Sequence, residues 1–291
     1  MRPILDVVNC LRPRQWTKNV LIFAALVFSR HAFEQWYLLR TAAAFLLFSL
    51  AAGSLYIFND IKDIERDRAH PVKRLRPIPA GRIAPTTAAV AAAVLLPGTL
   101  ALSWLLDFRF GIVMSVYALI QVLYTVRFKH IVILDVFVVA AGFVLRVVAG
   151  AVVIDVAISN WILICTMLLA LFLVLAKRRH ELTHLDDNGE NHRLILREYS
   201  PYLLDQMIGV VTAATLVTYM IYTLDDDTVA KFGPHGLVIT TPFVLYGIFR
   251  YLYLIHRKHE GGHPEELLLA DLPLQLAILG YGIAALAAIY L

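Results

Sequence analysis

A short polar segment interrupts the apolar sequence at residues 59–67, where one asparagine and three aspartates recur at helical intervals. Asp60, Asp63 and Asp67 stand at positions i, i+3 and i+7, which share one face of an α-helix, and Asn59 lies one turn before Asp63. Three carboxylates this close repel one another unless a cation binds between them. Carboxylate oxygens, completed by phosphate oxygens, are the ligands that Mg²⁺ prefers, so the spacing predicts a magnesium site at these three aspartates.

Basic residues follow the acidic segment at once. They are Arg66, Arg68, Lys73, Arg74 and Arg76. Cationic side chains beside a carboxylate–metal site are suited to a diphosphate ligand, whose charge is then balanced from both sides. The alternative is a solvated helix end, in which pairs such as Asp63 and Arg66 neutralise each other at helical spacing. The position of the cluster at the end of an apolar segment favours a functional site.

The rest of the chain is typical of a membrane protein. It has 291 residues, of which 59% are hydrophobic and 16% are charged, and its mean hydropathy is +0.70. A bilayer core is crossed by about 20 mostly apolar residues in a helix. The sequence contains nine such stretches, at 13–29, 40–58, 87–106, 109–126, 132–154, 159–176, 206–224, 236–255 and 272–290. We therefore predict an all-α, polytopic membrane protein with nine transmembrane helices in a single domain over residues 1–291.

The basic residues set the expected orientation. Most of the 26 Lys and Arg residues fall in the connections on the side of the N-terminus. The exceptions are Arg30, Arg40, Arg109, Lys231 and the mid-span Arg146. Because cytoplasmic connections carry such an excess, we expect a cytoplasmic N-terminus and cytoplasmic loops at 59–86 and 177–205, in an inner or plasma membrane. The net charge of +4 thus reflects membrane topology, and no nucleic-acid partner is expected.

The motifs resemble a known superfamily. The pattern NDxxDxxxD at residues 59–67, followed by RPIPAG at 76–81, resembles the first aspartate motif of the UbiA-type prenyltransferases. Within that superfamily the chain is most similar to the decaprenyl-phosphate phosphoribosyltransferases. Five motifs carry this similarity, namely LRPRQWTKN (11–19), HPVKRLRPIPAG (70–81), YTVRFKHIVILD (124–135), GFVLRVVAG (142–150) and AKRRHEL (176–182). The resemblance covers essentially the whole chain, and implies a nine-helix bundle with cytoplasmic active-site loops.

The resemblance also implies an activity and its partners. It implies Mg²⁺-dependent transfer of 5-phosphoribose from phosphoribosyl diphosphate (PRPP) to a polyprenyl phosphate, a glycosyl transfer of cell-wall precursor synthesis. The enzyme would bind membrane lipids as well as both substrates, and a homo-oligomer is left open. Asp60, Asp63 and Asp67 would be the catalytic, metal-binding residues. The residues expected to bind substrates are Lys18, Asn59, Lys73, Arg74, Tyr124, Lys129, Arg146, Lys177, Arg178 and Glu181.

Some of these substrate-binding residues have a more specific expected role. By the resemblance, Tyr124 and Lys129 would bind the PRPP donor, and Lys18 would bind the lipid phosphate. Arg146 lies in mid-span, where a charge costs at least about 2.5 kcal/mol and therefore needs a partner. That partner is either a helix carboxylate such as Asp135 or a substrate phosphate, with snorkelling to the interface as a further alternative. Asp135 is accordingly either an arginine partner or a site residue.

The sequence is also compatible with three other functions. A prenyltransferase that uses a prenyl diphosphate would carry a second aspartate-rich motif after the sixth helix, where this chain instead has Lys177, Arg178 and Glu181. The segment HELTH at 180–184 matches the HExxH pattern of zinc proteases, which would need a third ligand from His192, Glu190 or Glu198. A transporter is the remaining alternative. An odd number of spans and the lack of an inverted repeat argue against it.

Overall fold

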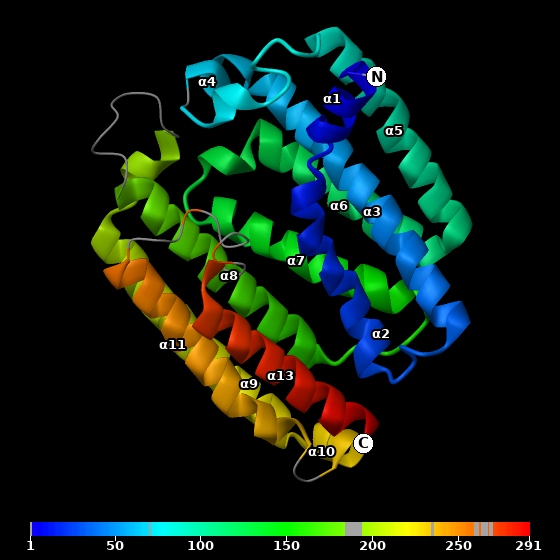
Figure 1. Ribbon diagram of the computed structural model, residues 1–291, viewed down its shortest axis with the longest axis vertical. Coiled ribbons are helices and arrows are strands. Elements are labelled where there is room, and N and C mark those ends of the chain that lie inside the picture. The colour runs from blue at the N-terminus through cyan, green and yellow to red at the C-terminus, as the bar shows by residue number, and fades with distance from the viewer. Residues whose placement is uncertain are drawn as a thin grey trace. The chain divides into compact units, whose positions relative to one another are not determined.

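The structure is a computed structural model. It describes residues 2–69, 71–183, 194–233, 236–258, 262, 267 and 270–291, and all regular elements among these residues are helices (Figure 1). The described chain forms two compact units. The first contains the residues up to Ile131 together with Gly142–Ile158, and the second contains Val132–Ala141 and Ser159–Leu291. The all-α prediction is confirmed, while the single-domain interpretation of residues 1–291 stays a prediction.

The first unit contains most of the N-terminal elements. They are α1 (Arg2–Cys10), the 3₁₀ helix η1 (Pro13–Phe23), α2 (Ala24–Phe28), α3 (Gln35–Lys62), α4 (Ile64–Ala69), η2 (Lys73–Leu75), α5 (Pro85–Leu106), α6 (Phe108–Val126) and η3 (Phe128–His130). Helix α7 (Leu134–Val153) begins in the second unit and ends in the first. The second unit also contains α8 (Asn160–Thr183), η4 (Leu194–Glu198), α9 (Pro201–Leu224), α10 (Asp226–Phe232), η5 (Leu237–Thr240), α11 (Thr241–Arg257) and α13 (Leu272–Tyr290).

Eight helical segments in the described part of the chain are long and apolar enough to cross a membrane. They correspond to the predicted spans from the second to the ninth. The first predicted span, 13–29, is not confirmed as a single α-helix, because it folds as η1 followed by the short α2. Its first half is polar and contains Arg14, Thr17, Lys18 and Asn19. Such residues find side-chain and backbone hydrogen-bond partners more readily in irregular structure than in an apolar helix.

Polar caps set where several long helices begin. Asp107 accepts a hydrogen bond from the backbone N–H of Phe110 (3.0 Å) at the start of α6, and Asp271 accepts one from Leu274 (2.9 Å) at the start of α13. Ser200 caps α9 through the N–H of Leu203 (3.1 Å). These bonds satisfy N–H groups that have no partner within the helix. The chain can therefore begin each apolar helix at a defined residue.

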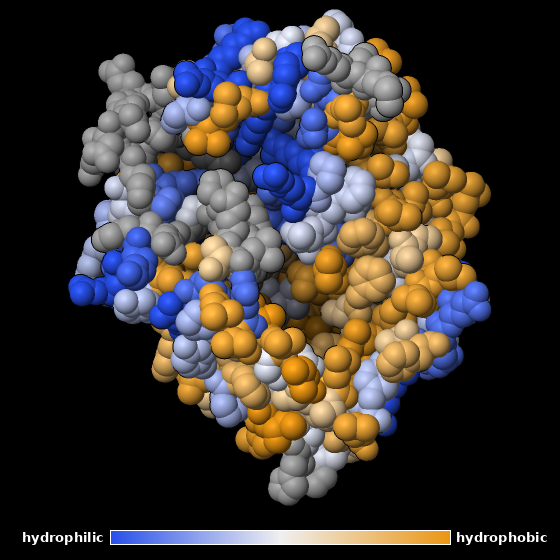
Figure 2. Space-filling view, in the orientation of Figure 1, coloured by the Kyte–Doolittle hydropathy of each residue, from blue (hydrophilic) through white to orange (hydrophobic). Residues whose placement is uncertain are grey.

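Apolar side chains cover the outside of the first unit. On α5 the side chains of Val90, Val94, Leu102 and Leu105 are 54–82% exposed, and Figure 2 shows hydrophobic residues gathered over α5 and hydrophilic residues near α4. An apolar surface of this kind is stable in contact with lipid tails and not in contact with water. The chain is therefore a multi-pass membrane protein, as predicted.

The interior of the first unit brings η1 against α7 at one glycine. A Cβ atom added at Gly150 would lie 1.9 Å from the carbonyl oxygen of Ile22. Ile22 is fully buried there, in a core that includes Phe48, Met114 and Ile154. Only glycine allows two backbones to approach so closely. This contact holds η1 in place although it is not an α-helix.

Gly150→Ala is expected to lower the stability of the protein. The added methyl group must displace the backbone of η1, and overpacking of this kind costs about 1–3 kcal/mol. The measurement is thermal unfolding in detergent. The matched control is Gly209→Ala on α9, where an added Cβ meets no atom within 4 Å and helix propensity alone would give a slight gain. Equal melting temperatures for the two variants would contradict the close approach of η1 and α7.

Candidate active site

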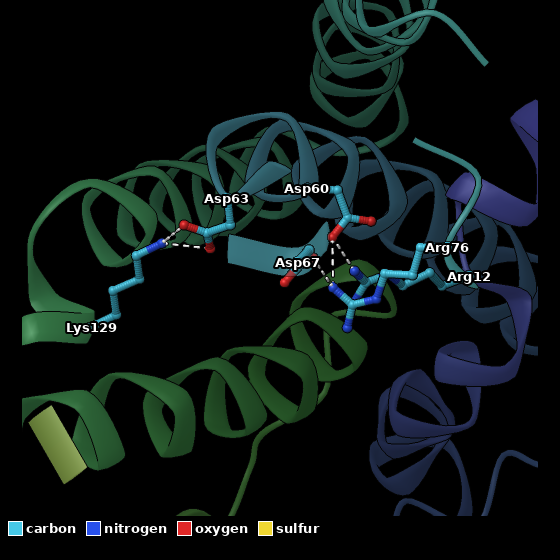
Figure 3. A network of polar contacts seen from close by, with 6 residues as sticks. All are labelled: Arg12, Asp60, Asp63, Asp67, Arg76 and Lys129. Atoms are coloured by element: carbon cyan, nitrogen blue, oxygen red, sulfur yellow. Dashed lines mark hydrogen bonds and ion pairs between the residues drawn. The ribbon is translucent and has the colours of Figure 1, made fainter. Parts of the chain in front are cut away.

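The acidic segment lies where α3 ends. Helix α3 stops at Lys62, Asp63 has the non-helical backbone angles φ −99° and ψ 13°, and α4 begins at Ile64. The prediction that Asp60, Asp63 and Asp67 share one helix face is therefore wrong, because the helix breaks at the middle aspartate. The break turns Asp63 in a different direction from the other two carboxylates (Figure 3).

Asp60 and Asp67 converge on the same arginine. Nη1 of Arg76 lies 2.9 Å from Oδ1 of Asp60 and 2.6 Å from Oδ2 of Asp67, and Arg12 donates a second bond to Oδ1 of Asp60. The two carboxylates are 3% and 4% exposed. Burial and the neighbouring Arg12 lower the pKa of Arg76 from its ordinary value. Two buried anions are thus neutralised by two guanidinium groups from distant parts of the sequence.

Asp63 binds a different cation. Nζ of Lys129, on η3, lies 2.8 Å from Oδ1 and 2.7 Å from Oδ2 of Asp63. The lysine side chain is 6% exposed and that of Asp63 is 20% exposed. An ammonium group so buried is retained only with a close anion, so this pair fixes both the end of α3 and the loop after α6. The structure therefore joins Lys129 directly to the acidic segment.

A divalent cation fits part of this arrangement. Asp60 and Asp67 already share one cationic nitrogen, and their oxygen atoms are the ligand type that a hard divalent ion prefers. Asp63 is bound to Lys129 instead. Within the described ranges, no three His, Cys, Asp or Glu side chains come together as a metal-binding group. The magnesium site at all three aspartates therefore stays a prediction, and would require Asp63 to turn from Lys129.

Five further predicted residues belong to the first unit and have varied surroundings. Lys18 lies on η1, where its Nζ donates to Gln15 (2.5 Å). The backbone carbonyl of Asn59 accepts from Asp63 (3.0 Å). Lys73 and Arg74 lie on η2, half-buried and exposed respectively, and Tyr124 is half-buried near the end of α6. Their roles in binding substrate stay predictions.

Arg146 lies in a separate, buried cluster of the first unit. Its guanidinium donates to Asn19 (2.7 Å), to the carbonyl of Gly142 (2.6 Å) and to the hydroxyl of Tyr117 (3.2 Å). The rings of Phe48, Tyr117 and Phe143 lie 5.0–5.4 Å from its central carbon. Neutral acceptors and aromatic faces thus stabilise this charge. The cluster holds the polar half of η1 against α6 and α7.

Asp135 is the partner of a different arginine. In the second unit, Oδ2 of Asp135 accepts from Nε of Arg178 (2.9 Å), and Nη1 of Arg178 donates to Glu181 (2.6 Å). Asp135 and Arg178 are both almost completely buried. The alternative that pairs Asp135 with Arg146 is therefore wrong, because the partner of Asp135 is Arg178. The alternative that Asp135 is a site residue stays a prediction. Lys177, half-buried on α8, precedes this pair.

Tyr199 completes the buried network of the second unit. Its hydroxyl donates to Oδ1 of Asp135 (2.8 Å) and accepts from the N–H of Ile133 (2.7 Å). Ile133 has φ +68°, which is strained for a β-branched residue. Burial raises the pKa of Tyr199 to about 12, so the hydroxyl remains a donor even at a pH where an ordinary tyrosine would ionise. The tyrosine thus stabilises the strained turn before α7.

Tyr199→Phe is expected to destabilise the second unit. The change leaves the N–H of Ile133 and one oxygen of Asp135 without this partner, and a buried polar group without a partner costs about 1–3 kcal/mol. Thermal unfolding in detergent measures the effect. The matched control is Tyr202→Phe, since Tyr202 is 75% exposed. A Tyr199→Phe variant as stable as the Tyr202→Phe variant would show that the hydroxyl does not support the turn.

The described residues give no support to the zinc-protease alternative. His184, Glu190 and His192 lie outside the described residues. Glu181, the glutamate of the HELTH segment, accepts a hydrogen bond from Arg178. The remaining candidate ligand, Glu198, is exposed on η4.

A cavity of about 420 Å³ lies at the opposite end of α3 from the acidic segment. Its lining includes Trp36, Arg40, Asp107, Arg109 and Asp155. Arg40 donates to Asp107 (3.4 Å) and Arg109 to Asp155 (2.7 Å). Because these charges are paired within the wall, the cavity lacks the excess of one charge that a phosphate or metal site needs.

The sequence did not single out two residues at the centre of the acidic cluster. Arg12 lies in the motif LRPRQWTKN and was assigned no role, and Arg76, which begins the motif RPIPAG, was named only among the basic residues suited to a diphosphate. Arg12 is separated from Asp60 by 48 positions, so no helical spacing could reveal the pair. Arg76 was one of five nearby basic residues, and nothing in the sequence favoured it over Lys73 or Arg74.

The fold and this site define a polytopic helical membrane protein with a charged cluster at one end of its longest helix. The chain matches the UbiA prenyltransferase family over residues 19–269. It therefore belongs to the UbiA prenyltransferase family. This result confirms the resemblance found in the aspartate motif.

Particular relatives and a solved structure agree with this assignment. The chain is 35% identical to the decaprenyl-phosphate phosphoribosyltransferase of Mycolicibacterium smegmatis, covering 99% of this chain and 93% of the relative. It is 33% identical to the protein of the same name from Mycobacterium tuberculosis, covering 96% and 92%. A UbiA homolog from Archaeoglobus fulgidus bound to GPP and Mg²⁺ has the same fold, with a TM-score of 0.72, 17% identity and coverage of 98% and 100%.

Proposed function

We propose that this protein transfers 5-phosphoribose from PRPP to a polyprenyl phosphate and releases diphosphate. The observation that carries the proposal is the similarity to decaprenyl-phosphate phosphoribosyltransferases along nearly the entire chain. The site geometry supports it, because carboxylates and cations alternate at one end of α3. Such a site can bind a metal-bridged diphosphate from both sides.

The reaction replaces one phosphate oxygen by another at the anomeric carbon. The bond between this carbon and the diphosphate breaks, its electron pair leaves with the diphosphate, and an oxygen of the lipid phosphate forms the new bond. The acceptor is already an anion, so its placement matters more than a general base. Asp60 and Asp67, with Asp63, would hold Mg²⁺, which when bound supplies positive charge to the leaving group.

Three of the remaining predicted residues would bind the two substrates. Lys129 and Tyr124 would bind the donor, and Lys18 would bind the lipid phosphate. The isoprenoid tail of the acceptor would lie against the apolar helices within the bilayer. From the excess of Lys and Arg on the N-terminal side, we infer that the N-terminus and the acidic segment face the cytoplasm, in an inner or plasma membrane.

A transfer assay on protein purified in detergent tests the proposal. One arm offers labelled PRPP with a polyprenyl phosphate, and the other offers labelled prenyl diphosphate with an aromatic acceptor, each with and without Mg²⁺. We expect label to enter the lipid phase only from PRPP and only with Mg²⁺. Transfer only from the prenyl diphosphate would keep the family and overturn the substrate assignment.

Lys129→Ala is expected to raise the Michaelis constant for PRPP about tenfold or more, with a smaller change for the lipid acceptor. A hydrogen bond to a charged group contributes about 1.5–3 kcal/mol, and 1.4 kcal/mol corresponds to a tenfold change in affinity. Steady-state kinetics with each substrate varied in turn measures both constants. The matched control is Lys62→Ala, because the Lys62 side chain is exposed at the end of α3. An unchanged constant for PRPP would exclude Lys129 from donor binding.

A further inference from the structure

The acidic cluster of the first unit is balanced in charge without any ligand. Asp60, Asp63 and Asp67 are matched by Arg12, Arg76 and Lys129, all in direct contact (Figure 3). A divalent cation added alone would leave this largely buried site with a net positive charge. A divalent cation that arrives with a diphosphate would not, because the anion compensates for it. The charge balance therefore favours joint binding of metal and diphosphate.

Arg76 occupies the position between two carboxylates that a metal ion would need. One nitrogen, Nη1, contacts both Asp60 and Asp67, at 2.9 Å and 2.6 Å. A cation that binds both carboxylates must displace this nitrogen. Protein guanidinium and metal thus compete for the same oxygen atoms.

The arginines lie on the more open side of the cluster. The side chains of Arg12 and Arg76 are 22% and 29% exposed, whereas those of Asp60 and Asp67 are 3% and 4% exposed. The guanidinium of Arg12 also lies over the ring of Tyr56, 4.9 Å from its centroid. A ligand that enters from solvent meets the guanidinium groups before it meets the carboxylates. Planar guanidinium groups bind phosphate oxygens in pairs, so displaced arginines remain well suited to a diphosphate.

We propose that Arg12 and Arg76 are exchangeable counter-ions: they neutralise Asp60 and Asp67 in the free protein and bind the donor's diphosphate when it enters with the metal. The inference rests on the proposed function for the identity of the donor, and on the charged cluster for the exchange itself. It makes Arg12 and Arg76 substrate-binding residues. It also predicts that the site binds a bare metal ion weakly.

Metal binding by the purified protein tests the exchange without any turnover. Equilibrium dialysis measures how much Mn²⁺, used in place of Mg²⁺, the protein retains with and without inorganic diphosphate. We expect the wild-type protein to bind Mn²⁺ weakly alone and more tightly with diphosphate. Arg76→Gln should bind Mn²⁺ alone roughly tenfold more tightly, since the competing cation is gone, and should gain less from diphosphate.

The matched control is Arg109→Gln, because Arg109 also pairs with an aspartate, Asp155 (2.7 Å), but at the surface and away from the acidic cluster. It should behave as the wild type in both dialysis arms. Arg76→Gln that binds Mn²⁺ no more tightly than the wild type would overturn the proposal. The proposal would also be overturned if Arg76→Gln bound Mn²⁺ more tightly than the wild type but gained as much affinity from diphosphate. In that case the arginine would not pass to the anion.

Two further variants keep the test decisive if Arg76→Gln does not fold. Arg76→Lys retains a charge, but its side chain ends one atom short of the Nη1 position that contacts both carboxylates. Arg12→Gln removes one of the two contacts to Asp60. Each should bind Mn²⁺ alone more tightly than the wild type, and no increase in either would overturn the exchange. Because dialysis uses neither PRPP nor the lipid, failure here and failure in the transfer assay are separate results.

Discussion

Buried carboxylates at the end of a membrane-spanning helix require cations, and this requirement organises the first unit. Asp60 and Asp67 are almost inaccessible to solvent, where an unpaired charge is very costly. Arg12 comes from the chain before η1, and Arg76 from the loop after α4. The same contacts that neutralise the acids therefore also fix the N-terminal segment and the loop around the end of α3.

The same constraint acts within the apolar spans. Arg146 is stabilised by neutral oxygens and aromatic faces, and this cluster holds η1 where an ordinary transmembrane helix was expected. In the second unit, Asp135 and Arg178 neutralise each other and Tyr199 shares the carboxylate. Each unit thus contains a polar network whose members are distant in sequence. Within a bilayer such networks cannot be replaced by water, so they determine where irregular backbone is tolerated.

The break at the end of α3 determines where the charged side chains of the site lie. The end of α3 at Lys62 turns Asp63 toward Lys129, away from the two carboxylates that bind Arg76. A continuous helix would have held all three acids on one face. The resulting arrangement divides the negative charge between an arginine pair and a lysine. A site divided in this way can accept a metal and a diphosphate together by exchanging contacts that already exist.

The sequence by itself determined the class of the protein. Hydropathy alone located eight spans, because an apolar stretch of that length is stable only in a bilayer, and the aspartate motif indicated the family. The spacing of Asp60, Asp63 and Asp67 at the end of an apolar segment indicated a site, and the family resemblance added Lys129 to it. Only the tertiary structure decided which charges meet. Arg12 and Asp60 are 48 positions apart, and such a pair depends on how helices pack, which no local pattern encodes.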